Sequence, residues 1–92
     1  MNEHEFHQLL NDRRFGPVRA VEYEPNQRPP LHAHDFSALV LVTGGKLTMA
    51  FENETRTLGP GQWCEVAAGT LHAECSGPEG AAGILGTDEA SD

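Results

Sequence analysis

The sequence predicts a single all-β domain with a short helix at its N-terminus. The chain has 92 residues, of which ten are glycine and six are proline, and this composition favours many tight turns. Short runs of aliphatic and β-branched residues recur roughly every 8–12 residues, which is typical of a sandwich or barrel. A helical pattern occurs only near the N-terminus, so repeated strand–helix–strand units are excluded.

The chain divides into three segments. Residues 1–17 are expected to be helical, because the apolar residues of EFHQLL recur at helical spacing and the pair Gly16–Pro17 ends the pattern. Residues 18–86 are expected to form the barrel. The stretch 87–92, TDEASD, is expected to be a disordered acidic tail.

The barrel segment contains strand-like runs separated by turns. These runs are VRAVEYE, ALVLV, KLTMAF, TRTL, QWCEV, LHAEC and AAGILG. Because Gly44–Gly45 and SGPEG are read as breaks between strands, about seven or eight short strands are expected. The residues expected to line the barrel or its core are Val40, Val42, Leu47, Met49 and Phe51.

The sequence does not decide whether Trp63 or Cys64 faces the interior of the barrel. Trp63 and Cys64 are neighbours on one strand, so one of them faces inward, and a tryptophan in the cavity could stack on a ligand or simply pack in the core. Cys64 and Cys75 fit no CxxC motif. In a cytosolic protein they are expected to be free thiols.

The charge distribution excludes some partners. The net charge is −8, and no lysine or arginine follows Arg56. Such a surface repels phosphate groups, so nucleic acid and anionic membranes are not expected partners. The longest apolar run, 38–42, is too short to span a bilayer, and the polar N-terminus does not resemble a secretory signal. We therefore expect a cytoplasmic protein.

Two histidines one residue apart, His32 and His34, open the run ALVLV. If they lie on a strand, both side chains project to the same face, and imidazole is the commonest protein ligand for transition metals. Two solvent-exposed histidines near a loop are the alternative. His4 and His7 share a face of the predicted helix, but they have no third partner there and are expected to be solvated.

The second half of the chain contains one histidine, which follows two glycines at a defined spacing. The segment GQWCEVAAGTLH has the spacing Gly61, Gly69, His72. With the HxH pair and Gly45, the chain resembles the cupin superfamily, whose two motifs are G-x5-H-x-H-x3,4-E-x6-G and G-x5-P-x-G-x2-H-x3-N. The resemblance covers roughly residues 18 to 86. It implies a cupin-type jelly-roll β-barrel.

The sequence departs from the cupin motifs at several positions. The motif glutamate falls at Ala38, or at Leu39 with the other permitted spacing, and neither residue can bind a metal. The opening glycine of the first motif is missing. In the second motif, Ala67 replaces the proline and Ser76 replaces the asparagine.

The resemblance implies a divalent transition metal, such as Fe, Zn, Ni or Mn, held by His32, His34 and His72. Three neutral histidines leave coordination positions open, as in the similar three-histidine iron site of thiol dioxygenases, and three-histidine zinc can activate water. Glu74 lies two residues beyond His72 and should share its face. It could be a fourth ligand, a catalytic general base, or an exposed carboxylate at a strand end.

Two functions from different classes follow from these features, and a barrel that retains its histidines without a tightly bound metal is the third alternative. The first is a small metal-dependent enzyme that oxygenates, isomerises or hydrolyses a small molecule. The second is a non-enzymatic module that senses a small ligand or a metal, because the HxHDF opening is similar to the sugar-sensing cupin domains of transcription regulators. A homodimer is also expected, because cupins commonly dimerise and a barrel this small has open edges and little core.

Overall fold

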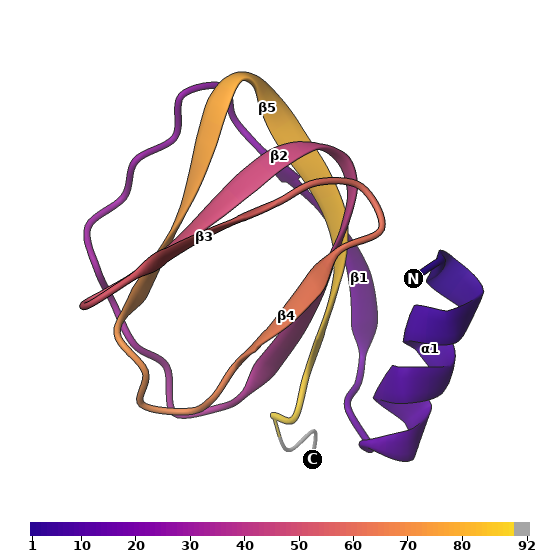
Figure 1. The fold of residues 1–92 in the computed structure, drawn as a ribbon. Coiled ribbons are helices and arrows are strands. Elements are labelled where there is room, and N and C mark those ends of the chain that lie inside the picture. The colour runs from indigo at the N-terminus through magenta and orange to yellow at the C-terminus, as the bar shows by residue number, and fades with distance from the viewer. Residues whose placement is uncertain (90–92) are drawn as a thin grey trace.

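The computed structural model describes residues 1–89, which form one helix and five strands. The elements are α1 (Glu3–Asp12), β1 (Val18–Tyr23), β2 (Ala38–Phe51), β3 (Thr55–Leu58), β4 (Trp63–Val66) and β5 (His72–Thr87). All strand pairs are antiparallel, in the order β1-β5-β2-β3, and β4 also pairs with β2. The sheet curls around a central axis, with α1 on its outside (Figure 1). The expected all-β jelly-roll barrel with a short N-terminal helix is confirmed.

Strand β2 is the central element of the sheet. One of its edges pairs with β5 from Ala38 to Phe51, while the other pairs with β4 at Ala38–Leu41 and with β3 at Leu47–Ala50. Two shifts in the β2–β5 register lie between Val42 and Leu47. Irregularities of this kind bend a strand and increase its twist, so the two halves of β2 contribute to different walls of the barrel.

The expectation of seven or eight short strands is wrong, because two pairs of runs are continuous. The Gly44–Gly45 pair lies inside β2, and the SGPEG stretch lies inside β5. Gly45 has φ +69°, and a Cβ atom at this position would collide with the carbonyl oxygen of Gly80 on the paired strand. The glycines therefore allow both strands to bend together without leaving the ladder.

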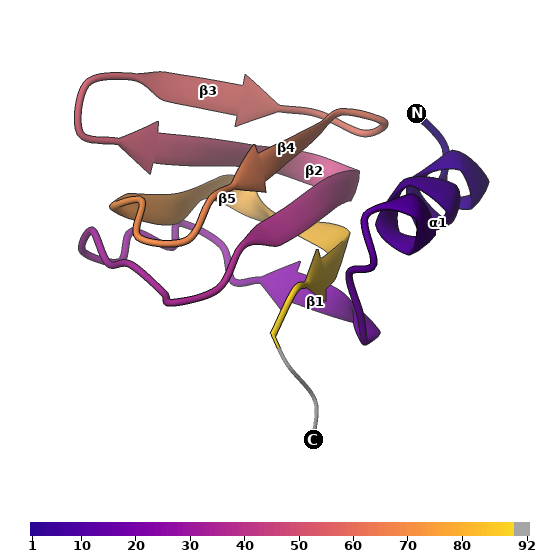
Figure 2. The same cartoon turned by 90° about the horizontal axis from the view of Figure 1, so that it is seen from below.

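Helix α1 covers the outer face of the sheet (Figure 2). It begins with a capping box, in which the Glu5 N–H donates to Asn2 Oδ1 at 2.8 Å and the Asn2 N–H donates to Glu5 Oε1 at 3.0 Å. Phe6 and Leu10 are buried against the sheet, and a Cβ at Gly86 would approach Leu10 Cδ2 to 2.6 Å. Within residues 1–89, no helix is long and apolar enough to cross a membrane.

The alternation of side chains along β2 creates two separate cores. The inner core contains Val40, Val42, Leu47, Met49, Leu58, Cys64 and Val66, with Phe51 packed beside it. The outer core contains Phe6, Leu10, Leu39, Leu41 and Ile84. The predicted lining residues are thus confirmed. Cys64 faces inward and Trp63 packs outward near α1, so the alternative of a ligand-stacking tryptophan inside the barrel is wrong.

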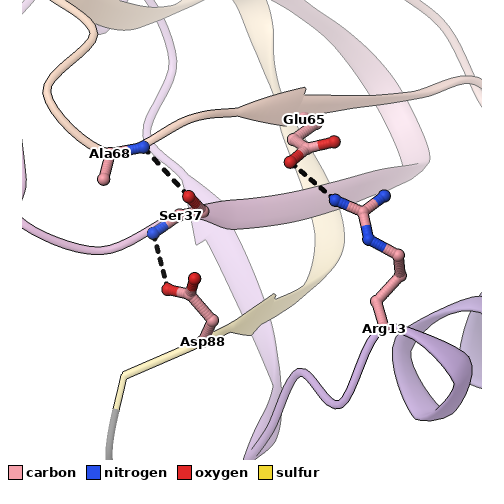
Figure 3. Close-up of polar contacts among 5 residues, drawn as sticks. All are labelled: Arg13, Ser37, Glu65, Ala68 and Asp88. Carbon is pink, nitrogen blue, oxygen red and sulfur yellow. Dashed lines mark hydrogen bonds and ion pairs between the residues drawn. The ribbon is translucent and has the colours of Figure 1, made fainter.

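Backbone and side-chain hydrogen bonds of Ser37 join three segments near one end of the barrel (Figure 3). Its N–H donates to Asp88 Oδ1 at 2.7 Å, its carbonyl accepts from the Asp88 N–H, and its Oγ accepts from the Ala68 N–H at 3.0 Å. The ordered chain therefore extends past residue 86, since Thr87 is buried at the end of β5. The last residues of the expected tail, 90–92, lie outside the described part of the chain.

A single ion pair joins the end of the helix to the sheet within residues 1–89. The Arg13 guanidinium lies 2.7 Å from Glu65 Oε2 (Figure 3), and both side chains are more than one-third exposed. Exposed pairs of this kind contribute about 0–1 kcal/mol to stability. The position of α1 is therefore set mainly by burial of Phe6 and Leu10.

Candidate metal centre

Backbone pairing brings the three predicted histidines together. His32 lies in the segment between β1 and β2 and forms an isolated antiparallel bridge with His72, the first residue of β5. Each of the two N–H groups donates to the other residue's carbonyl at 2.9 Å. The carbonyl of His34 accepts from the Gly69 N–H at 2.8 Å, which ties it to the turn before β5. The HxH pair does not open a strand as expected, because only His32 has strand-like pairing.

The three imidazoles form one cluster. Their candidate ligand atoms all lie within 4.8 Å of one another. Two nitrogen ligands on a common zinc ion would be roughly 3–4 Å apart, so small rotations of the rings would bring the three atoms onto one ion. His4 and His7 are exposed on α1 and do not belong to the cluster.

Hydrogen bonds at Nδ1 of His32 and His72 leave the Nε2 atom of each ring free to bind a metal. Nδ1 of His32 lies 3.0 Å from the Pro30 carbonyl oxygen, and Nδ1 of His72 lies 2.8 Å from the Thr70 carbonyl oxygen. Because a carbonyl only accepts, Nδ1 carries the proton in both neutral rings and Nε2 keeps its lone pair. Such bonds fix the tautomer of metal-ligating histidines. The donor set therefore fits a divalent transition metal.

The third ring is held differently. His34 is exposed, and its ring stacks on Phe36 with a centroid distance of 4.7 Å and an interplanar angle of 15°. His72, in contrast, is only 2% exposed. The cluster therefore has one buried imidazole, His72, at the barrel wall and one accessible imidazole, His34, on the side that faces solvent.

A pocket of about 190 Å³ adjoins the cluster. Its wall is formed by Arg19, His34, Phe36, Ala38, Val40, Val66, Ala67, His72, Glu74 and Leu85. Ala38 faces this pocket, whereas Leu39 is fully buried in the outer core beneath α1. Of the two positions at which the motif glutamate could fall, Ala38 is thus the one that faces the histidines' pocket.

Glu74 lies inside the pocket and not on the outside of a strand end. Its side chain is 25% exposed, and its Oε1 atom lies 4.0 Å from Nε2 of His72. This distance is too long for a hydrogen bond, but it places a carboxylate beside the Nε2 atom of His72, the nitrogen that keeps its lone pair. The structure thus brings Glu74 together with His34 and His72, and its role as ligand or base stays a prediction.

Two further groups, Tyr23 and Cys64, lie near Glu74, and of these Tyr23 was not identified from the sequence. Burial, and after it the nearby Glu74 carboxylate, raise the pKa of Tyr23 well above its usual value. Burial also raises the pKa of the Cys64 thiol from 9.0 to about 11, while Arg56 opposes the shift and Glu74 adds to it. Tyr23 is 51 residues from Glu74 in the sequence, so only the closed barrel reveals this arrangement.

The raised pKa of Cys64 predicts a loss of stability at alkaline pH. The unfolded thiol ionises near 9.0 and the folded one near 11, so folding keeps a proton that the unfolded chain releases. The stabilising contribution is present below pH 9 and is lost as the pH rises through 11, up to about 3 kcal/mol in total. Urea unfolding of wild type and Cys64→Val at pH 8 and pH 10.5 tests this. The variant should lose less stability between the two values, and an equal loss would contradict the prediction.

Comparisons with known proteins agree with this architecture. The family model for the cupin domain matches residues 19–81. Similar solved structures include a protein of unknown function from Rhizobium leguminosarum bv. viciae 3841, with 26% identity, a TM-score of 0.72, and coverage of 76% of this chain and 66% of that chain. No curated protein matches the sequence.

Two other similar structures show the same fold at lower identity. The polyketide cyclase RemF from Streptomyces resistomycificus is 24% identical, with a TM-score of 0.65 and coverage of 76% of this chain and 51% of that chain. The DMSP lyase DddQ from Ruegeria pomeroyi DSS-3 is 19% identical, with a TM-score of 0.71 and coverage of 82% and 40%. The chain thus spans at most 66% of the length of these three proteins. The matched family model and the fold together show that this chain belongs to the cupin domain family.

Proposed function

We propose that the barrel binds one divalent transition metal ion through His32, His34 and His72 and acts on a small molecule held in the adjoining pocket. The observation that carries this proposal is the convergence of three imidazoles within 4.8 Å at a pocket that also contains a carboxylate. The RemF and DddQ proteins are named as enzymes, so the fold is compatible with chemistry on small molecules.

His72, His34 and Glu74 each have a distinct part in this proposal. His72 provides a fixed ligand, because it is buried and its Nδ1 is bound to the Thr70 carbonyl. His34 completes the site from the solvent side. A bound divalent metal would supply Lewis-acid chemistry, such as polarisation of an oxygen or activation of water. Glu74 then accepts or returns a proton of the bound molecule, which favours hydrolysis or isomerisation over oxygenation.

Metal content is the direct test. Protein purified without chelators is expected to contain about one transition metal ion per chain, as counted by elemental analysis. The pairing of His32 with His72 is backbone-mediated, so the apoprotein is expected to stay folded and to take the metal back. A content well below a tenth of an equivalent, with no uptake on addition of Zn²⁺, Fe²⁺, Ni²⁺ or Mn²⁺, would overturn the proposal.

Exposed histidines offer a matched pair of variants. His34→Ala removes one ligand from an accessible position and should leave the fold intact, while the affinity for the metal falls by about 100-fold or more. His4→Ala removes an equally exposed histidine outside the cluster and should leave the affinity unchanged. Competition with a chromophoric chelator measures both. Equal affinities in the two variants would show that the ligand set is wrong.

Turnover separates the enzyme from the alternative of a binding module. The metal-loaded protein is screened with esters, lactones, sugars, diketones and thiols. Conversion of any class supports the enzyme. Tight binding of a small molecule without conversion supports a ligand-sensing module instead.

A further inference from the structure

The pocket wall contains one charged side chain that the metal site and the proposed proton transfer do not use. Arg19 is part of the pocket wall and is the only cationic side chain of that wall among the described residues, apart from the histidines. It lies on the edge strand β1, where it pairs with Leu85, and Leu85 in turn pairs with Val40 on β2. Residues directly opposite on paired strands share one face of the sheet, so the three side chains form a row along the pocket.

Arg19 has no ion-pair partner among residues 1–89. Arg13 provides the contrast, because its guanidinium is held by Glu65. Arg19 is exposed and lies at the pocket wall beside the apolar side chains of Val40 and Leu85. Its guanidinium presents parallel N–H donors that match a carboxylate. Arg19 is thus available to an anionic group that enters the pocket from solvent.

We propose that the pocket takes a small monocarboxylate whose carboxylate binds Arg19 and whose compact apolar body packs on Val40 and Leu85. This inference deepens the proposed function, because it names the substrate class of the same pocket. The volume of about 190 Å³ is comparable with that of cavities of about 150 Å³ that bind benzene, so the pocket admits a branched body of a few carbons. The net charge of −8 and Glu74 in the wall disfavour a second carboxylate on the ligand.

Three probes of similar shape test this assignment. Isovalerate carries the carboxylate, isovaleramide is its neutral analogue, and methylsuccinate carries a second carboxylate. NMR chemical-shift titrations of the wild-type protein, in the metal-free and Zn²⁺-loaded forms, are expected to show isovalerate binding at millimolar concentration and at least about tenfold tighter than the other two.

Arginine variants identify the residue responsible. Arg19→Gln should weaken isovalerate binding by about tenfold in both forms and leave isovaleramide unchanged, whereas Arg19→Lys should restore part of the loss. Arg28→Gln makes the same charge change at an exposed arginine outside the pocket wall and should have no effect. These comparisons separate a local contact from a change in net charge.

The outcomes distinguish this inference from the proposed function. If Zn²⁺ does not bind but isovalerate affinity depends on Arg19, the metal proposal fails and the carboxylate assignment stands. If Zn²⁺ binds and isovalerate affinity is the same in wild type and Arg19→Gln, the carboxylate is bound elsewhere and the assignment is overturned. Absence of isovalerate binding to both forms of the wild type overturns it as well.

Discussion

Gly45→Ala is expected to destabilise the barrel by about 4 kcal/mol, enough to leave much of the protein unfolded. A non-glycine residue at a positive φ costs about 1–2 kcal/mol. The larger part comes from the new Cβ atom, which would collide with the Gly80 carbonyl oxygen and lie 3.0 Å from the Ala81 Cα. Both groups belong to the backbone of the paired strand β5, so relief of the collision requires breaking of the ladder. Urea unfolding followed by circular dichroism measures the effect.

Gly69→Ala is the matched control for this substitution. Gly69 also has a positive φ, +82°, but a Cβ atom at this position has no neighbour within 4 Å. Its replacement should therefore cost only the backbone term, about 1–2 kcal/mol. The difference in free energy of unfolding between the two variants therefore measures the cost of the collision between the new Cβ atom on β2 and the backbone of β5. If both variants lose the same stability, the close contact between Gly45 and β5 does not contribute to the cost, and the prediction is wrong.

Ala38→Glu is expected to tighten the binding of a divalent metal by at least about 100-fold. Ala38 faces the same pocket as His34 and His72, and a carboxylate at this position would add a charged oxygen ligand to three neutral imidazoles. In the metal-free protein the same carboxylate is partly buried without a partner, so stability should fall by about 1–3 kcal/mol. Chelator competition and urea unfolding, each with and without Zn²⁺, measure the two opposite effects.

Ala38→Gln separates ligand charge from side-chain size. It introduces nearly the same volume without the negative charge, so the gain in metal affinity should be largely absent. An equal gain in both variants would mean that position 38 acts through packing. No gain in Ala38→Glu would place this residue too far from the histidines to contribute a ligand.

Local patterns were enough to identify the histidines and the inner wall of the barrel. The alternation in KLTMAF correctly places Leu47 and Met49 on the inner face. Val40 and Val42 of the buried run ALVLV are also confirmed as lining residues. The spacing of His32, His34 and His72 relative to the glycines correctly indicated residues that the fold brings together. These features depend on residues close in sequence or on a spacing that the family maintains.

Features that depend on contacts between distant segments were not predictable from the sequence. The sequence alone predicts that a strand ends at Gly44–Gly45, because no local pattern reveals that Gly80 lies beside Gly45 on β5. The proximity of Tyr23 to Glu74 also requires the β1 and β5 strands to be placed. Similarly, the orientation of Trp63 was decided by where α1 docks. Dimerisation, the bound metal and the catalytic role of Glu74 remain predictions.

The bridge between His32 and His72 has a consequence for the order of events during folding. Two of the candidate ligands pair through their backbones across 40 positions of the chain, and the third is tied to the turn before β5. Contacts over such separations form late, because the entropy of loop closure opposes them until other strands are in place. In a zinc finger, the metal drives folding of a chain that is otherwise unfolded. Here metal uptake is expected to follow closure of the barrel, so a partly synthesised chain has no site to fill.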